Sequence, residues 1–215
     1  MAKQLKQIFG ALVNPEAFFE GADSGSLKKW IGPILVLIGA VTLVLVVTRL
    51  LGPADPVFLE SGEFKPPANL VQNPSPLRRF LFPLYWAGIV LYGWFARYGG
   101  VLVFGENNRR ARDVLMITLI GALPLLLLSA LFGTINQLFP YWQQRPDSVL
   151  FVARLAANFL FFAFAFLWEA RIVVAGFRIL FDQNRGRAIV TWLLPAIGLL
   201  FCATPAVMFL YVSVR

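Results

Sequence analysis

Histidine is missing from this 215-residue chain, and cysteine occurs once, as Cys202. Without histidine the chain lacks the usual axial ligand of haem, the commonest zinc and copper ligand and the usual general base at neutral pH. One cysteine within an apolar run can form neither an intrachain disulfide nor a thiolate metal site. These absences argue against catalysis and against a bound metal or other cofactor.

Charged residues are also scarce, at 14% of the chain, whereas hydrophobic residues make up 59% and the mean hydropathy is +0.72. This composition predicts an integral membrane protein, whose first partner is the lipid bilayer. The net charge of +8 does not indicate nucleic-acid binding, because the basic residues lie in short connections between apolar segments. No nucleic-acid partner is expected.

Five segments are apolar and long enough to cross a hydrocarbon core of about 30 Å, which takes about 20 helical residues. We therefore predict an all-α integral membrane protein with a five-helix transmembrane domain at residues 32–215. The first 31 residues lack the features of a cleaved signal peptide, so the first span is expected to direct its own insertion. The predicted spans are 32–51, 80–103, 114–138, 155–177 and 188–212.

Residues 1–31 are predicted to form a separate cytoplasmic segment that contains an amphipathic helix. Its apolar residues recur at helical spacing, while lysines and glutamines lie mostly off that face. Such a helix would lie along the membrane surface. Asn14 and Pro15 then have the residue types of a helix N-cap and first helical position. The apolar residues of the first helix are Leu5, Ile8, Phe9, Leu12 and Val13.

The basic residues between the spans predict the orientation of the chain. Ten lie on the side of the N-terminus and five on the opposite side, when those within or beside spans are set aside. By the positive-inside rule the N-terminus is cytoplasmic and the C-terminus external. The larger set is Lys3, Lys6, Lys28, Lys29, Arg109, Arg110, Arg112, Arg178, Arg185 and Arg187; the smaller is Lys65, Arg78, Arg79, Arg145 and Arg215.

The only long connection, at residues 52–79, is predicted to be external and contains six prolines. So many prolines exclude a regular helix or a central strand. Long loops without regular structure are uncommon unless they are functional. The connection is therefore either a surface loop or a segment that contacts a partner.

Ionisable groups within the spans are the candidate functional residues, because a charge at the centre of a membrane helix costs about 2.5–3.5 kcal/mol on insertion scales. Glu169 lies 14 residues into the fourth span, or about 21 Å from its external end. Arg97 reaches a comparable depth in the second span, so we predict an ion pair between Glu169 and Arg97. A proton or substrate pathway through Glu169 is the alternative.

Other residues of the spans are predicted to hold the helices at the membrane surface. Arg171 points about 200° away from Glu169 around the helix, so it cannot share that face. Arg171 and Arg178 are expected to extend toward the cytoplasmic headgroups. Tryptophans near the span ends are predicted interface anchors. They are Trp30, Trp86 and Trp142. The phenylalanines of the fourth span surround the helix, which favours ordinary packing over a site for an apolar ligand.

The order of these features resembles the Yip-type family, the Ypt/Rab-interacting five-span membrane proteins, and its bacterial members in particular. The similar stretches are LVNPEAFF at 12–19, Gly32-Pro33, NNRRARD at 107–113, IGALPLLL with Gly121 and Pro124, WEARIVVAGFRIL at 168–180 and NRGRA at 184–188. The motif that precedes the first span in eukaryotic members is replaced here by Lys29, Trp30 and Ile31. No GTPase partner is therefore expected.

The resemblance implies a non-enzymatic membrane protein, and some bacterial relatives are associated with ABC-type exporters. We expect no catalytic residue, since the sequence has neither a nucleophile with a neighbouring base nor a phosphate-binding loop. The favoured interpretation is an accessory or scaffold subunit that packs beside other integral proteins of a bacterial cytoplasmic membrane. The alternative is a small transporter or permease component.

Overall fold

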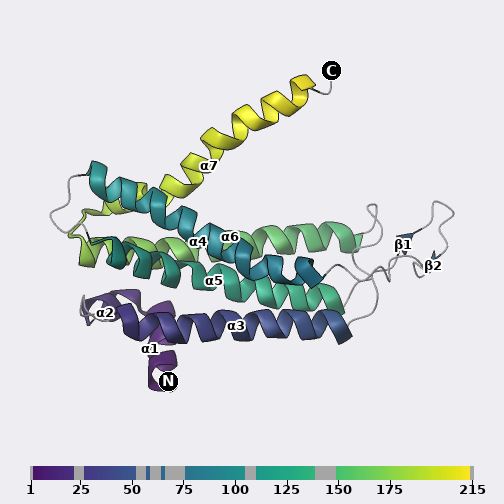
Figure 1. Cartoon of the computed structure of the whole chain (residues 1–215), viewed down its shortest axis with the longest axis horizontal. Coiled ribbons are helices and arrows are strands. Elements are labelled where there is room, and N and C mark those ends of the chain that lie inside the picture. The colour runs from purple at the N-terminus through teal and green to yellow at the C-terminus, as the bar shows by residue number, and fades with distance from the viewer. Residues whose placement is uncertain are drawn as a thin grey trace. The chain divides into compact units, whose positions relative to one another are not determined.

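The computed structural model describes residues 2–21, 27–51, 57–58, 64–65, 76–104, 110–138 and 149–213. These residues are almost entirely helical, which confirms the all-α prediction (Figure 1). The helices are α1 (Ala2–Val13), α2 (Pro15–Glu20), α3 (Leu27–Leu51), α4 (Pro76–Val103), α5 (Ala111–Leu138), α6 (Val149–Leu180) and α7 (Arg185–Ser213).

Most of the proline-rich connection lies outside the described residues. Within it, two short strands, β1 (Val57–Phe58) and β2 (Phe64–Lys65), pair in antiparallel fashion, with Val57 opposite Lys65. The connection also ends earlier than predicted, because α4 begins at Pro76. Proline is favoured in the first turn of a helix, where its missing N–H has no intrahelical partner to lose.

Each of the five predicted spans falls within one helix, from α3 to α7. Among the described residues, two helical stretches are long and apolar enough to cross a membrane, Ala111–Phe132 of α5 and Leu155–Leu180 of α6. A shorter apolar stretch, Trp30–Val44, lies in α3. The helical nature of the segments is thus confirmed, while the crossing of the membrane by these five helices stays a prediction.

The described residues divide into two compact units, and α3, α4, α5 and α6 each contribute to both. Unit 1 comprises Met1–Ile31, Gly88–Ala122 and Ala170–Arg215, and unit 2 comprises Gly32–Ala87 and Leu123–Glu169. The largest fully buried side chains of unit 1 come from α1, α2, α4, α5 and α6, among them Ile8, Phe19, Ile117 and Phe177. The N-terminal segment that the sequence sets apart therefore belongs to the same unit as the ends of the later helices.

The apolar face predicted for α1 is only partly buried. Ile8 and Leu12 are buried in unit 1, whereas Phe9 and Val13 are exposed, Val13 by 71%. The start of α2 follows the prediction: Asn14 accepts a hydrogen bond from the Ala17 N–H at 3.4 Å, and Pro15 occupies the first helical position. The exposed pair leaves apolar surface that a membrane could cover.

Candidate functional site

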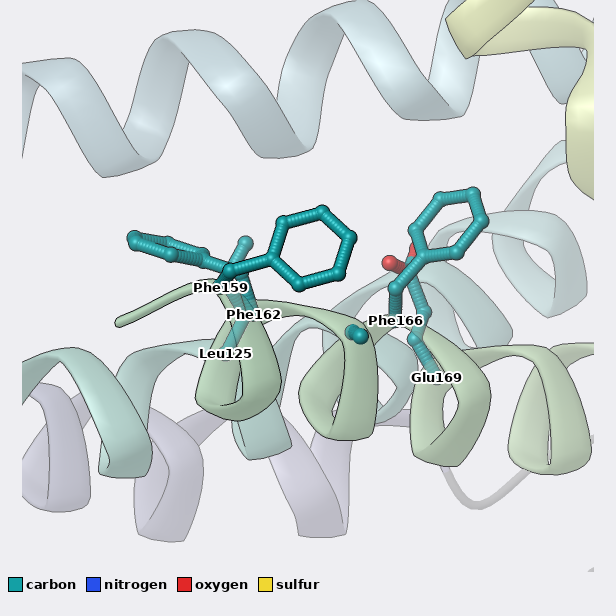
Figure 2. Close-up of a pocket in the computed structure, with 6 residues that line it drawn as sticks. Leu125, Phe159, Phe162, Phe166 and Glu169 are labelled. Atoms are coloured by element: carbon teal, nitrogen blue, oxygen red, sulfur yellow. The ribbon is translucent and has the colours of Figure 1, made fainter. Parts of the chain in front are cut away.

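A largely apolar groove lies in unit 2, between α6 and the side chain of Leu125 from α5. Its volume is about 370 Å³, within the range of about 300–1,000 Å³ usual for small-molecule sites. From α6 it is lined by Phe159, Phe162, Ala163, Phe166 and Glu169. Figure 2 shows the three phenylalanine side chains and Glu169 projecting to the same side of α6. Glu169 is the one ionisable residue of the lining.

The groove follows from the spacing of residues along α6. Positions 159, 162, 166 and 169 are three or four residues apart, so their side chains fall on one stripe of an α-helix. Ala163 contributes only a methyl group between the rings, which leaves the hollow. Sequence reasoning treated the phenylalanines as surrounding the helix and missed this subset. The spacing from Glu169 back to Phe159 was the signal that could have found it.

The other aromatic side chains of this part of α6 point elsewhere. Phe161 packs edge-on against Phe132 of α5, with ring centroids 4.7 Å apart. Phe164 packs against Trp168 at 5.4 Å and stays more than half exposed. Phe161 therefore contributes to the packing of α6 against α5.

A second constellation is a set of buried polar residues in unit 1. Arg97 on α4 is 4% exposed and Asp113 on α5 is 2% exposed. Thr118, Gln183 and Thr191 are also buried there. Burial of a charge is costly unless the charge is paired and hydrogen-bonded. These buried polar groups therefore need hydrogen-bond partners from within unit 1.

Two close approaches bring α4 and α5 together around these charges. Trp94 donates a hydrogen bond from Nε1 to the carbonyl oxygen of Ala111 at 2.8 Å. A Cβ atom at Gly93 would lie 3.4 Å from Cγ2 of Thr118 and 3.5 Å from Nη1 of Arg97. On α5, Asp113 lies between Ala111 and Thr118, the two residues that approach α4.

The predicted pair of Glu169 and Arg97 stays a prediction. The two residues belong to different units, and Glu169 is half-buried whereas Arg97 is almost fully buried. Asp113 is an equally buried carboxylate within the unit of Arg97, and sequence reasoning missed it as a candidate partner. Asp113 lies in the first turn of α5, where an acidic residue is common at a solvent-exposed helix end, so its residue type and position do not indicate burial.

The turn between α6 and α7 forms the other part of the polar set. Asp182 adopts a left-handed conformation, with φ of 52°, and the Gln183 N–H returns to the carbonyl oxygen of Phe177 at 3.4 Å. The Oδ1 atom of Asn184 caps α7 by accepting from the Arg187 N–H at 2.9 Å. The buried Thr191 hydroxyl donates to Oε1 of Gln183 at 3.2 Å.

The predicted anchors are in varied surroundings, and their role at the headgroups stays a prediction. Arg171 is exposed, whereas Nη1 of Arg178 lies 3.5 Å from Oε1 of Glu16, joining α6 to α2 within unit 1. Both side chains of this pair are about half exposed, so its contribution to stability is small. Trp30 and Trp86 are buried, and Trp30 packs against Phe18 at 5.1 Å. Trp142 lies outside the described residues.

The described residues hold no group of three or more cysteine, aspartate or glutamate side chains that could bind a metal ion. Their long apolar helices, with a few charges buried among them, define a helical membrane protein. The family model described as the Yip1 domain matches residues 9–205, so the chain belongs to the Yip1 domain family. Searches of curated proteins and of solved structures find no match. The Yip1 family is not known for enzymatic activity.

Proposed function

We propose that this chain is a non-catalytic accessory or scaffold subunit that packs beside other integral proteins of a bacterial cytoplasmic membrane. It crosses the membrane five times, with the N-terminus in the cytoplasm and the C-terminus outside. Family membership supports a membrane-associated, non-enzymatic role but does not choose between a scaffold and a transporter.

The observation that carries the scaffold proposal is the exposed apolar surface of α6. Only 28% of the best membrane-spanning window of α6 is buried, compared with 56% in α5. Large apolar side chains stay exposed on several sides of this helix. They include Val152, Leu155, Phe159, Leu160, Phe164 and Leu167. Both lipid and the helices of another protein can cover such a surface, because association in membranes depends on packing rather than on apolar burial.

Extraction from the native host in a mild detergent tests the scaffold proposal. We expect the chain to elute with at least one other membrane protein at constant stoichiometry, as judged by intact-complex mass spectrometry. A matched extraction of a chain with Leu160→Arg and Leu167→Arg should lose that companion, because both changes place charges on the exposed face of α6. A chain that always elutes alone contradicts the proposal.

A small transporter or permease component is the second candidate, favoured by the groove that contains Glu169. A substrate pathway through a membrane protein needs a polar or ionisable group at depth, and Glu169 lies well inside the spanning stretch of α6. In that case Glu169→Gln abolishes a measurable flux in proteoliposomes while the protein stays folded. A flux that the substitution leaves unchanged removes Glu169 from such a pathway.

A further inference from the structure

Exposed arginines flank the starts of two helices of unit 1, α5 and α7. Arg110 directly precedes α5 and Arg112 is its second residue, while Arg185 and Arg187 lie in the first turn of α7. All four side chains are exposed, and within the part of the chain that the structure describes none of them forms an ion pair. We call these four residues the arginine surface. Their charge is available to a partner outside the chain.

The two pairs of arginines lie around the same part of unit 1, because the beginnings of α5 and α7 both pack against the C-terminal part of α4. Trp94 donates its hydrogen bond to the carbonyl oxygen of Ala111, the first residue of α5. A Cβ atom at Gly100 would lie 3.4 Å from Cγ2 of Thr191, and the Thr191 hydroxyl donates to the carbonyl oxygen of Arg187 at 3.0 Å.

The exposed charges of unit 1 do not cancel. Its described residues include six exposed arginines but three exposed carboxylates, and Glu16 is already paired with Arg178. The net positive charge of this surface favours an anionic partner. The arginines are Arg110, Arg112, Arg171, Arg178, Arg185 and Arg187, and the carboxylates are Glu16, Glu20 and Asp182.

Exposed apolar side chains lie one turn away from the arginine surface. Ile189 is four residues after Arg185 and so shares its face of α7, and the neighbouring Val190 is exposed as well. At the end of α4, Val103 is 83% exposed. Four helical residues rise about 6 Å, and the headgroup region on each side of a bilayer is about 5–8 Å thick. The basic and apolar side chains of α7 therefore have the spacing of lipid headgroups and acyl chains.

The surroundings favour lipid over an acidic soluble protein. If α4, α5 and α7 cross the membrane as proposed above, the apolar residues lie in hydrocarbon and the arginines lie at the depth of the headgroups. We propose that the arginine surface binds the headgroups of anionic phospholipids in preference to zwitterionic ones. A zwitterionic headgroup carries its own cation beside the phosphate, whereas an anionic headgroup keeps a net charge for the planar guanidinium groups to pair with.

Spin-labelled lipids test this proposal in bilayers. The purified full-length chain is reconstituted in phosphatidylcholine, and a trace of spin-labelled phosphatidylglycerol or spin-labelled phosphatidylcholine is added. Electron paramagnetic resonance separates lipid immobilised at the protein from lipid free in the bilayer. We expect phosphatidylglycerol to associate about two- to fivefold more strongly than phosphatidylcholine at low salt. In about 1 M sodium chloride the preference should largely disappear, because salt screens the charges.

Matched variants assign the preference to the arginine surface. A chain in which all four arginines are replaced by glutamine should bind the two lipids nearly equally. The same four positions changed to lysine keep the charge and should keep most of the preference. Glu16→Gln combined with Arg178→Gln removes a paired arginine at no change in net charge, and should leave the preference unaltered. Thermal unfolding shows which variants are folded, and the pairs Arg110→Gln with Arg112→Gln and Arg185→Gln with Arg187→Gln replace the fourfold change if it does not fold.

Equal association of the two lipids with the unmodified chain overturns the proposal, as does a preference that the glutamine changes leave intact. Loss of a companion protein from the glutamine variant, with the lipid preference unchanged, would assign the surface to an acidic protein instead. The lipid measurement uses the isolated chain in symmetric bilayers. Its outcome is therefore distinct from that of the extraction experiment, and it does not depend on which side of the membrane the surface faces.

Discussion

At the scale of single residues, Arg97 and Asp113 are two buried charges of opposite sign in one unit. Loss of one partner of a buried ion pair strands the other charge in a poorly solvated place, at a cost of about 3–5 kcal/mol. We predict that Asp113→Asn and Arg97→Gln each lower the stability of the folded chain by this order. Thermal and denaturant unfolding in detergent, followed by circular dichroism, measures the loss.

A double-mutant cycle decides which carboxylate is the partner of Arg97. We expect the coupling energy between Arg97→Gln and Asp113→Asn to exceed the coupling between Arg97→Gln and Glu169→Gln, because Asp113 shares the unit and the burial of Arg97. The reverse order would restore Glu169 as the partner.

At the scale of elements, the close packing of α6 against α5 in unit 1 depends on glycine. A Cβ atom at Gly176 of α6 would lie 2.8 Å from Cγ1 of Ile117 on α5, a distance that real side chains do not tolerate. We predict that Gly176→Val lowers the unfolding temperature, by an overpacking cost of about 1–3 kcal/mol. Gly99→Val on α4 is the matched control, because nothing lies within 4 Å of its added Cβ. Equal effects of the two changes would contradict this packing.

The turn from α6 to α7 gives a second prediction at this scale. Asp182 adopts a left-handed conformation, which costs most residues about 1–2 kcal/mol and which glycine adopts freely. Asp182→Val should therefore destabilise the chain by about that amount, since a β-branched residue resists this conformation. Asp182→Gly should leave stability unchanged or raise it. Thermal unfolding of both variants tests the turn, and equal stability of the valine and glycine variants would argue against it.

At the scale of the whole molecule, the proposed topology predicts the side of the membrane on which each connection lies. Reporter enzymes that are active only outside the cytoplasm should be active when fused after Arg215 or within residues 139–148, and inactive within residues 105–109. Reporters active only in the cytoplasm should give the opposite pattern. A cytoplasmic C-terminus would exclude five spans with a cytoplasmic N-terminus.

Much of this protein could be predicted from sequence because the relevant signals are local. The signals of apolar runs about 20 residues long, and of Asn14 and Pro15 at a helix start, depend on neighbours within a few residues along the chain. They predicted the helices and the membrane class, and short motifs spread along the chain predicted the Yip-type family. Glu169 was also recognised as the unusual carboxylate of its helix.

Only the tertiary structure decided which of these side chains meet. Asp113 is buried in the unit of Arg97, Arg178 meets Glu16 across 162 positions of the chain, and three of the α6 phenylalanines join Glu169 and Leu125 around one hollow. These outcomes depend on how far each helix is rotated and how closely its neighbour approaches. Helical periodicity specifies which residues share a face, but it does not specify which other helix that face contacts.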